Sequence, residues 1–292
     1  MFLSWFRAAS FVKDARSLPP ALSMLACLVV LFLSTGCIGS MGPVVAHPAA
    51  EGEAAVGVTT ITVNDPTRDR QLTVEVWYPA AHPASDEEAP VVYDVEAMGG
   101  TVARLRSPTR AHRDVAPRSG GPYPVVLVSH GTGSTRFGNL TLCETLASHG
   151  YIVAAPDHRG DTVDDALFGI SFDQRARNTF NRPLDLSRVL DDLEARSKDA
   201  QSLFSGLIDM NRVAVAGHSF GSSTAMAIAG ARFNAPRQEK ECEKNNADRR
   251  CRVLPVLGPA PYRYRDPRVK ALVLISPAGF DLYREDGVAA VV

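Results

Sequence analysis

The stretch 211–230, NRVAVAGHSFGSSTAMAIAG, constrains the fold of this chain more than any other part of the sequence. A short β-branched run leads through GHSFG at 217–221 into an alanine-rich run, which is the strand, sharp turn and helix of a G-x-S-x-G motif. Glycines at both ends allow strand and helix to approach closely, and the strained turn lifts the Ser219 hydroxyl clear of the sheet. The N–H of Phe220 then lies at a helix N-terminus, where negative charge is favoured. Taken alone, the motif also fits a serine that only caps a helix after a buried strand.

Strand and helix patterns alternate along the chain around this motif. Continuous apolar runs, typical of strands buried on both faces, occur at 125–129, 151–155, 213–216 and 269–275. Helices are predicted between them, at about 140–149, where Gly150 ends the helix, and at about 183–196, which has an apolar face and begins at a proline. Strands alternating with helices predict an α/β fold with a mostly parallel sheet and helices on both faces.

The remaining segments before the motif are simpler. The runs 59–63 and 72–78 flank a polar turn and predict an antiparallel hairpin. The segments 80–121 and 157–182 show little periodicity, so we expect both to be connections without regular structure.

Loops at the carboxyl ends of parallel strands meet at one edge of a sheet. Here these loops are HGTG at 130–133, DHRG at 157–160, GHSFG at 217–221 and SPAG at 276–279. A Gly-rich loop after a buried strand, ahead of the serine turn, is where an α/β-hydrolase fold takes its second oxyanion N–H. We therefore predict that the N–H groups of Thr132 and Phe220 form an oxyanion hole beside Ser219. The alternative for His130 and Gly131 is a turn that only ends a strand.

The first 37 residues have the layout of an export signal. Basic residues precede the apolar run 21–33, which is too short to span a bilayer comfortably. The run ends in STGC at 34–37, which resembles a bacterial lipoprotein signal in which Cys37 becomes the lipid-modified first residue. An uncleaved anchor or a plain secretory signal is the alternative. Each interpretation places the rest of the chain outside the cytoplasm, as a membrane-anchored lipoprotein or in the periplasm or medium.

Three further segments follow this signal. The small, Pro- and Ala-rich segment 38–55 predicts a flexible tether, and 56–292 the α/β-hydrolase domain. Within the domain, the polar, basic insertion 233–268 lies between the serine motif and the next strand and is expected to act as a lid. Cys242 and Cys251 lie in this insertion of an exported protein, so we predict a disulfide between them.

Composition excludes several classes of function. A formal net charge of −1 argues against nucleic acid as a partner. With 45% hydrophobic residues, the 292-residue chain contains enough apolar side chains for one large core or two small ones. No C-x-x-C and no clustered histidines accompany the cysteines, so no metal site is predicted.

Four motifs together resemble a known family. They are VEVWYPA at 74–80, VSHGTGS at 128–134, LASHGYIVAAPDHRG at 146–160 and GHSFG at 217–221. This combination is similar to the platelet-activating factor acetylhydrolase group and to the related bacterial proteins described as predicted dienelactone hydrolases. The resemblance covers about residues 57–280. It implies an α/β-hydrolase without metal or organic cofactor that cleaves carboxylic esters, with a short acyl chain on a phospholipid-like or other small ester.

The resemblance also implies roles for particular residues. The serine of GHSFG is the nucleophile of the family, which corresponds to Ser219. The oxyanion donors are the residue after His-Gly and the residue after the serine, which correspond to Thr132 and Phe220. Ser222 stands where a second glycine is usual, and we expect that change to be mild.

A serine nucleophile needs a base and an acid, which in this fold follow the serine along the chain. All seven histidines precede Ser219, and Ser276 occupies the position of the family's acid. Three carboxylates follow, and we expect them to be solvated loop charges: Asp281, Glu285 and Asp286. We therefore predict a truncated chain that lacks the last strands and helix of the fold, and with them the base and the acid.

Two alternatives remain from the sequence. One is a non-catalytic surface lipoprotein that binds a hydrophobic ligand or a partner in the same crevice. The other is a local histidine as base. His218 neighbours the serine on the turn and should point away from it, and His130 and His158 are expected to pack beneath the site.

Overall fold

The computed structural model describes residues 52–81, 91–97, 100–105, 110–233, 240, 243, 264–279, 282–283, 288 and 291. The elements follow in the order β1 (Ala55–Asp65), β2 (Arg70–Ala80), β3 (Tyr93–Ala97), β4 (Gly100–Leu105), β5 (Ala111–Arg113), β6 (Tyr123–Ser129), α2 (Leu140–Ser148), β7 (Ile152–Pro156), α3 (Val163–Leu167), α4 (Phe172–Lys198), β8 (Ile208–His218), α5 (Phe220–Ile228) and β9 (Val269–Ile275). None of these helices is both long and apolar enough to cross a membrane.

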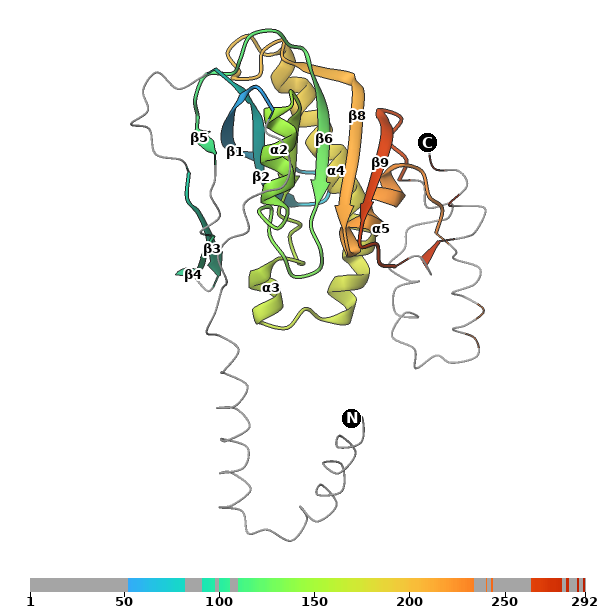
Figure 1. Ribbon diagram of the computed structural model, residues 1–292. Helices are drawn as coiled ribbons and strands as arrows, with labels where there is room; N and C mark the ends of the chain where they lie inside the picture. Colours follow the sequence, from blue (N-terminus) through green and yellow to red (C-terminus); the bar gives the residue numbers. More distant parts are fainter. Residues whose placement is uncertain are drawn as a thin grey trace, which may run out of the picture. The chain divides into compact units, whose positions relative to one another are not determined.

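One mixed sheet organises the described residues, with the strand order β5-β1-β2-β7-β6-β8-β9 (Figure 1). The pairs β7–β6, β6–β8 and β8–β9 are parallel. The pairs β1–β2 and β2–β7 are antiparallel, so β1 and β2 form the hairpin that their sequence predicts. The predicted α/β fold with a mostly parallel sheet is therefore confirmed.

Helices cover both faces of this sheet. In Figure 1, α2 lies in front of the strands, and α4 and α5 lie behind them. Side chains alternate between the faces along a strand, so neighbouring residues of β6 enter different cores. Val126 packs in one core with Leu140 of α2. Val125 packs in the other core with Leu186 of α4 and Ile228 of α5. Continuous apolar runs in the sequence are the consequence of this two-sided burial.

The connection predicted at 157–182 is wrong. Helix α3 occupies part of it, and α4 begins at Phe172, with Ser171 as its N-cap, rather than at Pro183. A proline is favoured in a first turn, yet it removes only one backbone N–H, and here it lies inside the helix. The residues before Pro183 stay helical, and three of them are buried: Ala176, Asn178 and Arg182.

The segment 80–121 is also more regular than predicted. The strands β3 and β4 form a separate two-stranded sheet, and β5 pairs in parallel with β1 at the edge of the main sheet. The residues just before 56 are bonded to the domain: the N–H of Gly52 donates to Ser148 Oγ at 3.1 Å, and that of Ala54 donates to the Ser148 carbonyl at 3.1 Å. The last residues of the predicted tether are thus bonded to the end of α2.

Aromatic side chains meet where the insertion 233–268 leaves and rejoins the domain. The Phe233 ring lies 5.3 Å from that of Phe180 on α4 and 5.7 Å from that of Tyr264. Most of the insertion lies outside the described residues, as do the signal segment 1–37 with Cys37, and Cys242 and Cys251. The lipid site, the disulfide and the lid therefore stay predictions.

Candidate active site

Ser219 lies in the turn between β8 and α5 with a backbone conformation that serine rarely adopts, φ 52° and ψ −119°. Its N–H donates to the carbonyl oxygen of Ile275, the last residue of β9, at 3.0 Å. Its own carbonyl accepts the N–H of Ala278 at 3.3 Å. Bonds from the end of β9 and its following loop therefore hold the turn from both sides, which keeps the strained serine in one place.

The two glycines of the motif are required by close backbone contacts. A Cβ on Gly217 would lie 2.1 Å from the carbonyl oxygen of Gly221, and a Cβ on Gly221 would lie 2.0 Å from that of Ser129. No side chain fits at such distances. The G-x-S-x-G spacing therefore encodes the packing of α5 against the ends of β8 and β6.

Ser222 takes part in the same turn. Its buried hydroxyl donates to the carbonyl of Gly217 at 2.6 Å and contacts that of Ile275 at 3.2 Å. A glycine at this position could not make the bond to the Gly217 carbonyl. The departure from the family's usual glycine thus has a structural reason.

The Gly-rich loop after β6 passes directly beside Ser219. A Cβ built on Gly131 would lie 3.4 Å from Ser219 Cβ. Thr132 follows in this loop with an exposed side chain, and Phe220 begins α5. Among the described residues, neither the Thr132 N–H nor the Phe220 N–H has an acceptor. Both predicted oxyanion donors are therefore near the serine with unused N–H groups.

His158 lies in a sealed set of side chains that has the composition of a catalytic triad. Its Nε2 lies 3.0 Å from Ser129 Oγ, and its Nδ1 lies 3.2 Å from Asp185 Oδ2. All three side chains are fully buried. Burial, and secondarily the charge of Arg182, lower the pKa of His158 to about 3. The set is thus neutral at the histidine and closed to substrate, which fits packing beneath the site.

His130 is held in the same region. The N–H of His158 donates to His130 Nε2 at 3.1 Å, so Nε2 is the unprotonated nitrogen, and Nδ1 can donate to the Gly131 carbonyl at 2.7 Å. Burial, together with Arg182, holds the pKa of His130 well below its usual range. His130 is therefore occupied in backbone bonds and is a poor base.

No histidine within the described residues hydrogen-bonds to Ser219 Oγ. His218 is half-buried, with Nδ1 at 3.3 Å from the Cβ position of Gly131. Ser276, which the sequence resemblance aligns with the acid, has φ 44°. The predicted loop carboxylates Asp281, Glu285 and Asp286 lie outside the described residues.

A buried ion pair beneath the loop was not predicted from the sequence. Arg182 Nη1 donates to Asp161 Oδ2 at 2.9 Å, and neither side chain is exposed. Burial lowers the pKa of Arg182 to about 10 and raises that of Asp161, although the guanidinium opposes the second shift. One signal was present: Arg182 precedes Leu186 by four residues, which places a charge on the apolar face of the helix.

Another buried carboxylate, that of Asp185 on α4, is held by two arginines. Arg70 binds Asp185 through Nε at 2.9 Å and Nη2 at 2.8 Å, and Arg68 Nη2 lies 3.0 Å from the same carboxylate. Burial tends to raise the pKa of Asp185, but the bonds from His158 and Arg70 bring it below its ordinary value. This carboxylate stays ionised and fixes the Nδ1 side of His158.

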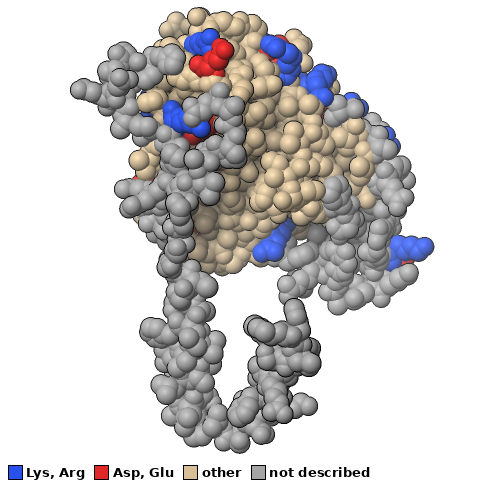
Figure 2. All heavy atoms as spheres, viewed as in Figure 1, with Lys and Arg blue, Asp and Glu red and all other residues tan. Residues whose placement is uncertain are grey.

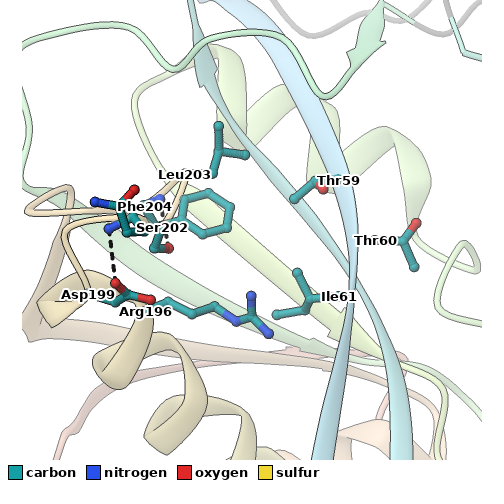
Figure 3. Close-up of a pocket in the computed structure, with 9 residues that line it drawn as sticks. Thr59, Thr60, Ile61, Arg196, Asp199, Ser202, Leu203 and Phe204 are labelled. Atoms are coloured by element: carbon teal, nitrogen blue, oxygen red, sulfur yellow. Dashed lines mark hydrogen bonds between the residues drawn. The ribbon is translucent and has the colours of Figure 1, made fainter.

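Neither of two cavities in the described residues includes Ser219. The cavity in Figure 3, about 370 Å³, is lined by β1, the end of α4 and the segment before β8, and the Arg196 side chain extends toward Ile61. A second cavity, about 210 Å³, is lined by residues that follow the Gly-rich loop, such as Thr135 and Phe137, and by Asp157. Neither is lined by Ser219, so we assign neither to the reacting ester.

Charged side chains are scattered over the described surface that Figure 2 shows. The described surface in Figure 2 is mostly uncharged, and the charged side chains that it shows include both signs. Within the described part of the chain, no three His, Cys, Asp or Glu side chains are grouped to bind a metal ion.

The parallel sheet, the strained serine between β8 and α5, and the Gly-rich loop after β6 together define an α/β-hydrolase. A model of the chlorophyllase family matches residues 89–240, just over half of the chain. The chain belongs to the chlorophyllase family.

Proteins with similar sequences include an acetylhydrolase and a cutinase. The chain is 27% identical over 139 residues to platelet-activating factor acetylhydrolase of Gallus gallus, which is 41% of this chain and 32% of the relative. It is 33% identical over 116 residues to cutinase est2 of Thermobifida alba, 40% of this chain and 33% of that protein. The predicted resemblance to the acetylhydrolases is thus confirmed, and the matches span about a third of the length of these relatives.

One solved structure is similar to part of this chain. The ferulic acid esterase from Streptomyces cinnamoneus is 27% identical, with a TM-score of 0.46 over 62% of this chain and 56% of that chain.

Proposed function

We propose that this protein is an ester hydrolase in which Ser219 is the nucleophile and the N–H groups of Thr132 and Phe220 stabilise the oxyanion. The observation that carries the proposal is the conformation of Ser219, a non-glycine residue at φ 52° that neighbouring loops hold beside a Gly-rich loop. Strain of this kind persists where the surrounding structure over-determines it, and it is frequent at active sites. The names of the acetylhydrolase and cutinase relatives support the same chemistry.

The proposed reaction is acyl transfer in two steps. Ser219 Oγ forms a bond to the ester carbonyl carbon while its proton passes to a base, and the carbonyl oxygen becomes an oxyanion. Collapse breaks the bond to the alcohol, which leaves with a proton, and water then releases the acid from the acyl-serine. Each oxyanion donor is worth about 100- to 1000-fold in rate. The proposal assigns no base within the described residues.

The proposed substrate is an ester with a short acyl chain on a lipid-like or small alcohol. This choice follows the sequence resemblance and agrees with the name of the acetylhydrolase relatives. From the sequence alone, we also propose that the chain is exported and that a lipid on Cys37 anchors it to a membrane.

Labelling with a fluorophosphonate tests the nucleophile directly. We expect wild-type protein to form an Oγ–P bond at Ser219 with loss of fluoride, and Ser219→Ala to lose labelling by at least about 100-fold. Ser223→Ala is the matched control, because it removes a buried hydroxyl of the same helix that bonds to Tyr283 instead. Equal labelling of wild type and Ser219→Ala, or no labelling of either, would rule out the proposed nucleophile and favour a crevice that only binds.

Hydrolysis of p-nitrophenyl esters tests the substrate class. We expect faster turnover of the acetyl than of the palmitoyl ester, and loss of both activities in Ser219→Ala. A preference for the long chain would contradict the proposed acyl group without affecting the nucleophile.

A further inference from the structure

Arg182 contacts the start of the loop that carries Thr132. Its side chain is fully buried on α4. Nη2 donates to Ser129 Oγ at 3.2 Å and also to the backbone carbonyl of His130, while Nη1 donates to Asp161. The guanidinium thus holds the end of β6 and a carboxylate at the same time.

Asp161 contacts the other side of the same loop. Its Oδ1 accepts the backbone N–H of Gly133 at 3.0 Å, and its Oδ2 binds Arg182. The ion pair is therefore bonded to the residue before and to the residue after the Gly131–Thr132 dipeptide. Hydrogen bonds to charged groups are about twice as strong as neutral ones, so they fix the loop on both sides of the Thr132 N–H.

The same guanidinium also contacts the residue that carries the other donor. Arg182 Cζ lies 5.1 Å from the centroid of the Phe220 ring, which is within the range of a cation–π interaction. One side chain therefore connects α4 to both walls of the candidate oxyanion hole.

A purely stabilising role explains these contacts poorly. Burying two charges is costly, and apolar replacements of a buried ion pair are often as stable or more stable. Among the described residues, Arg182 Nε has no hydrogen-bond partner, so the burial is not fully compensated. The remaining bonds of the pair are directed at the loop backbone and at Ser129.

We propose that Asp161 and Arg182 are positioning residues that set the places of the Thr132 and Phe220 N–H groups for the oxyanion. This inference rests on the proposed function of Ser219, because the position of the loop has a chemical consequence only when an oxyanion forms there. Neither residue touches the ester.

Two conservative variants distinguish the charges of Arg182 and Asp161 from the hydrogen bonds that these side chains make. Arg182→Lys keeps the positive charge but loses the fork that binds Asp161 and His130 together. Asp161→Asn keeps an acceptor for the Gly133 N–H but loses the negative charge. The matched control is Arg268→Lys, which changes a cluster with Asp266 and Asp191, at 2.7 and 2.8 Å, that does not contact the loop.

Two measurements on full-length protein test the inference after thermal unfolding has shown that each variant is folded. In Arg182→Lys and Asp161→Asn, we expect kinact for fluorophosphonate labelling of Ser219 to fall about 10- to 100-fold, with KI unchanged within about threefold. Hydrogen exchange in the peptide 130–134 should become at least about tenfold faster. Arg268→Lys should match wild type in both.

Wild-type values of kinact and of exchange in both variants would overturn the inference. If a single variant does not fold, Asp161→Asn/Arg182→Gln replaces it, since it removes both charges while retaining polar groups, and the same criteria apply. A wild-type protein that does not label refutes the proposed function instead, and the exchange of 130–134 then decides by itself whether the pair holds the loop.

Discussion

At Gly221 the fold depends on a missing side chain. The backbone of α5 approaches the end of β6 so closely that a Cβ would meet the carbonyl oxygens of Ser129 and His130 at 2.0 and 2.8 Å. Backbone atoms cannot rotate away as a flexible side chain does, so an added methyl group must push the helix from the sheet. Ser219 and the Phe220 N–H would move with it.

We expect Gly221→Ala to destabilise the protein by about 2–3 kcal/mol and to abolish labelling of Ser219 in the protein that remains folded. Gly100→Ala is the control, because a Cβ there meets nothing within 4 Å and surface changes of this kind stay within about 0.5 kcal/mol. Urea unfolding compares the two variants. Equal stability of both would show that α5 can shift without cost.

At the scale of elements, the ends of β6 and β7 are joined by neutral histidines. His130 follows β6 and accepts the backbone N–H of His158, which follows β7, and the two rings lie 5.1 Å apart. Two buried imidazoles at this distance would repel each other if both were charged, and Arg182 adds a permanent positive charge beside them. The junction is therefore stable only while both rings stay neutral.

This junction makes stability depend on pH. The pKa of His158 is about 3 in the folded protein, whereas an unfolded histidine titrates near about 6.5. Between these values the unfolded chain binds more protons, so the stability that His158 contributes is complete above about pH 6.5 and is lost as the pH falls toward 3. In His158→Gln, we expect the slope of unfolding free energy against pH between 6 and 4 to decrease by roughly 1.4 kcal/mol per unit. The exposed position of His149 provides the control variant, His149→Gln. An unchanged slope in His158→Gln would contradict the assignment.

The elements also show what the sequence can and cannot predict. β6, β7 and β8 were predictable because a strand buried on both faces is apolar at nearly every position. β9 has a similar apolar run, which also predicts burial on both faces, but most of its residues are partly or fully exposed. β5 was not, since its three residues have no periodicity and pair only because β1 offers an edge. The first turns of α4 were not predicted, because a proline is typical of the first turn of a helix and the sequence therefore predicts a start at Pro183. Tertiary contacts decide where the helix begins.

In the candidate site, the sequence predicts residues that belong to one short motif, but it does not predict contacts between residues far apart in the chain. The turn around Ser219 is encoded within five residues, so its glycines could be predicted together with their role. Asp161 and Arg182 are 21 residues apart in a segment without a motif, and only the packed structure brings them to the Thr132 loop. A charge on an apolar helix face was the one sign of this pair.

At the scale of the whole molecule, the described sheet has one flank with apolar side chains in contact with solvent. In the described part of the sheet, β9 lies next to β8 and is the last strand on that side. Val273 on β9 is 50% exposed. An edge strand with exposed apolar residues offers unpaired backbone groups and an apolar face to a second chain. We therefore expect self-association to begin at β9.

We therefore expect the wild-type chain to associate in a concentration-dependent way, and Val273→Lys to raise its solubility by about twofold or more, because a charge on an edge strand opposes pairing. Leu203→Lys is the matched control, since Leu203 is a 38% exposed leucine that lies outside the sheet. Light scattering after size-exclusion chromatography measures the monomer fraction of the three proteins at equal concentration. If both lysine variants improve solubility equally, general surface charge explains the effect, and a wild-type monomer with a sharp cooperative melt would show that β9 is not a site of association.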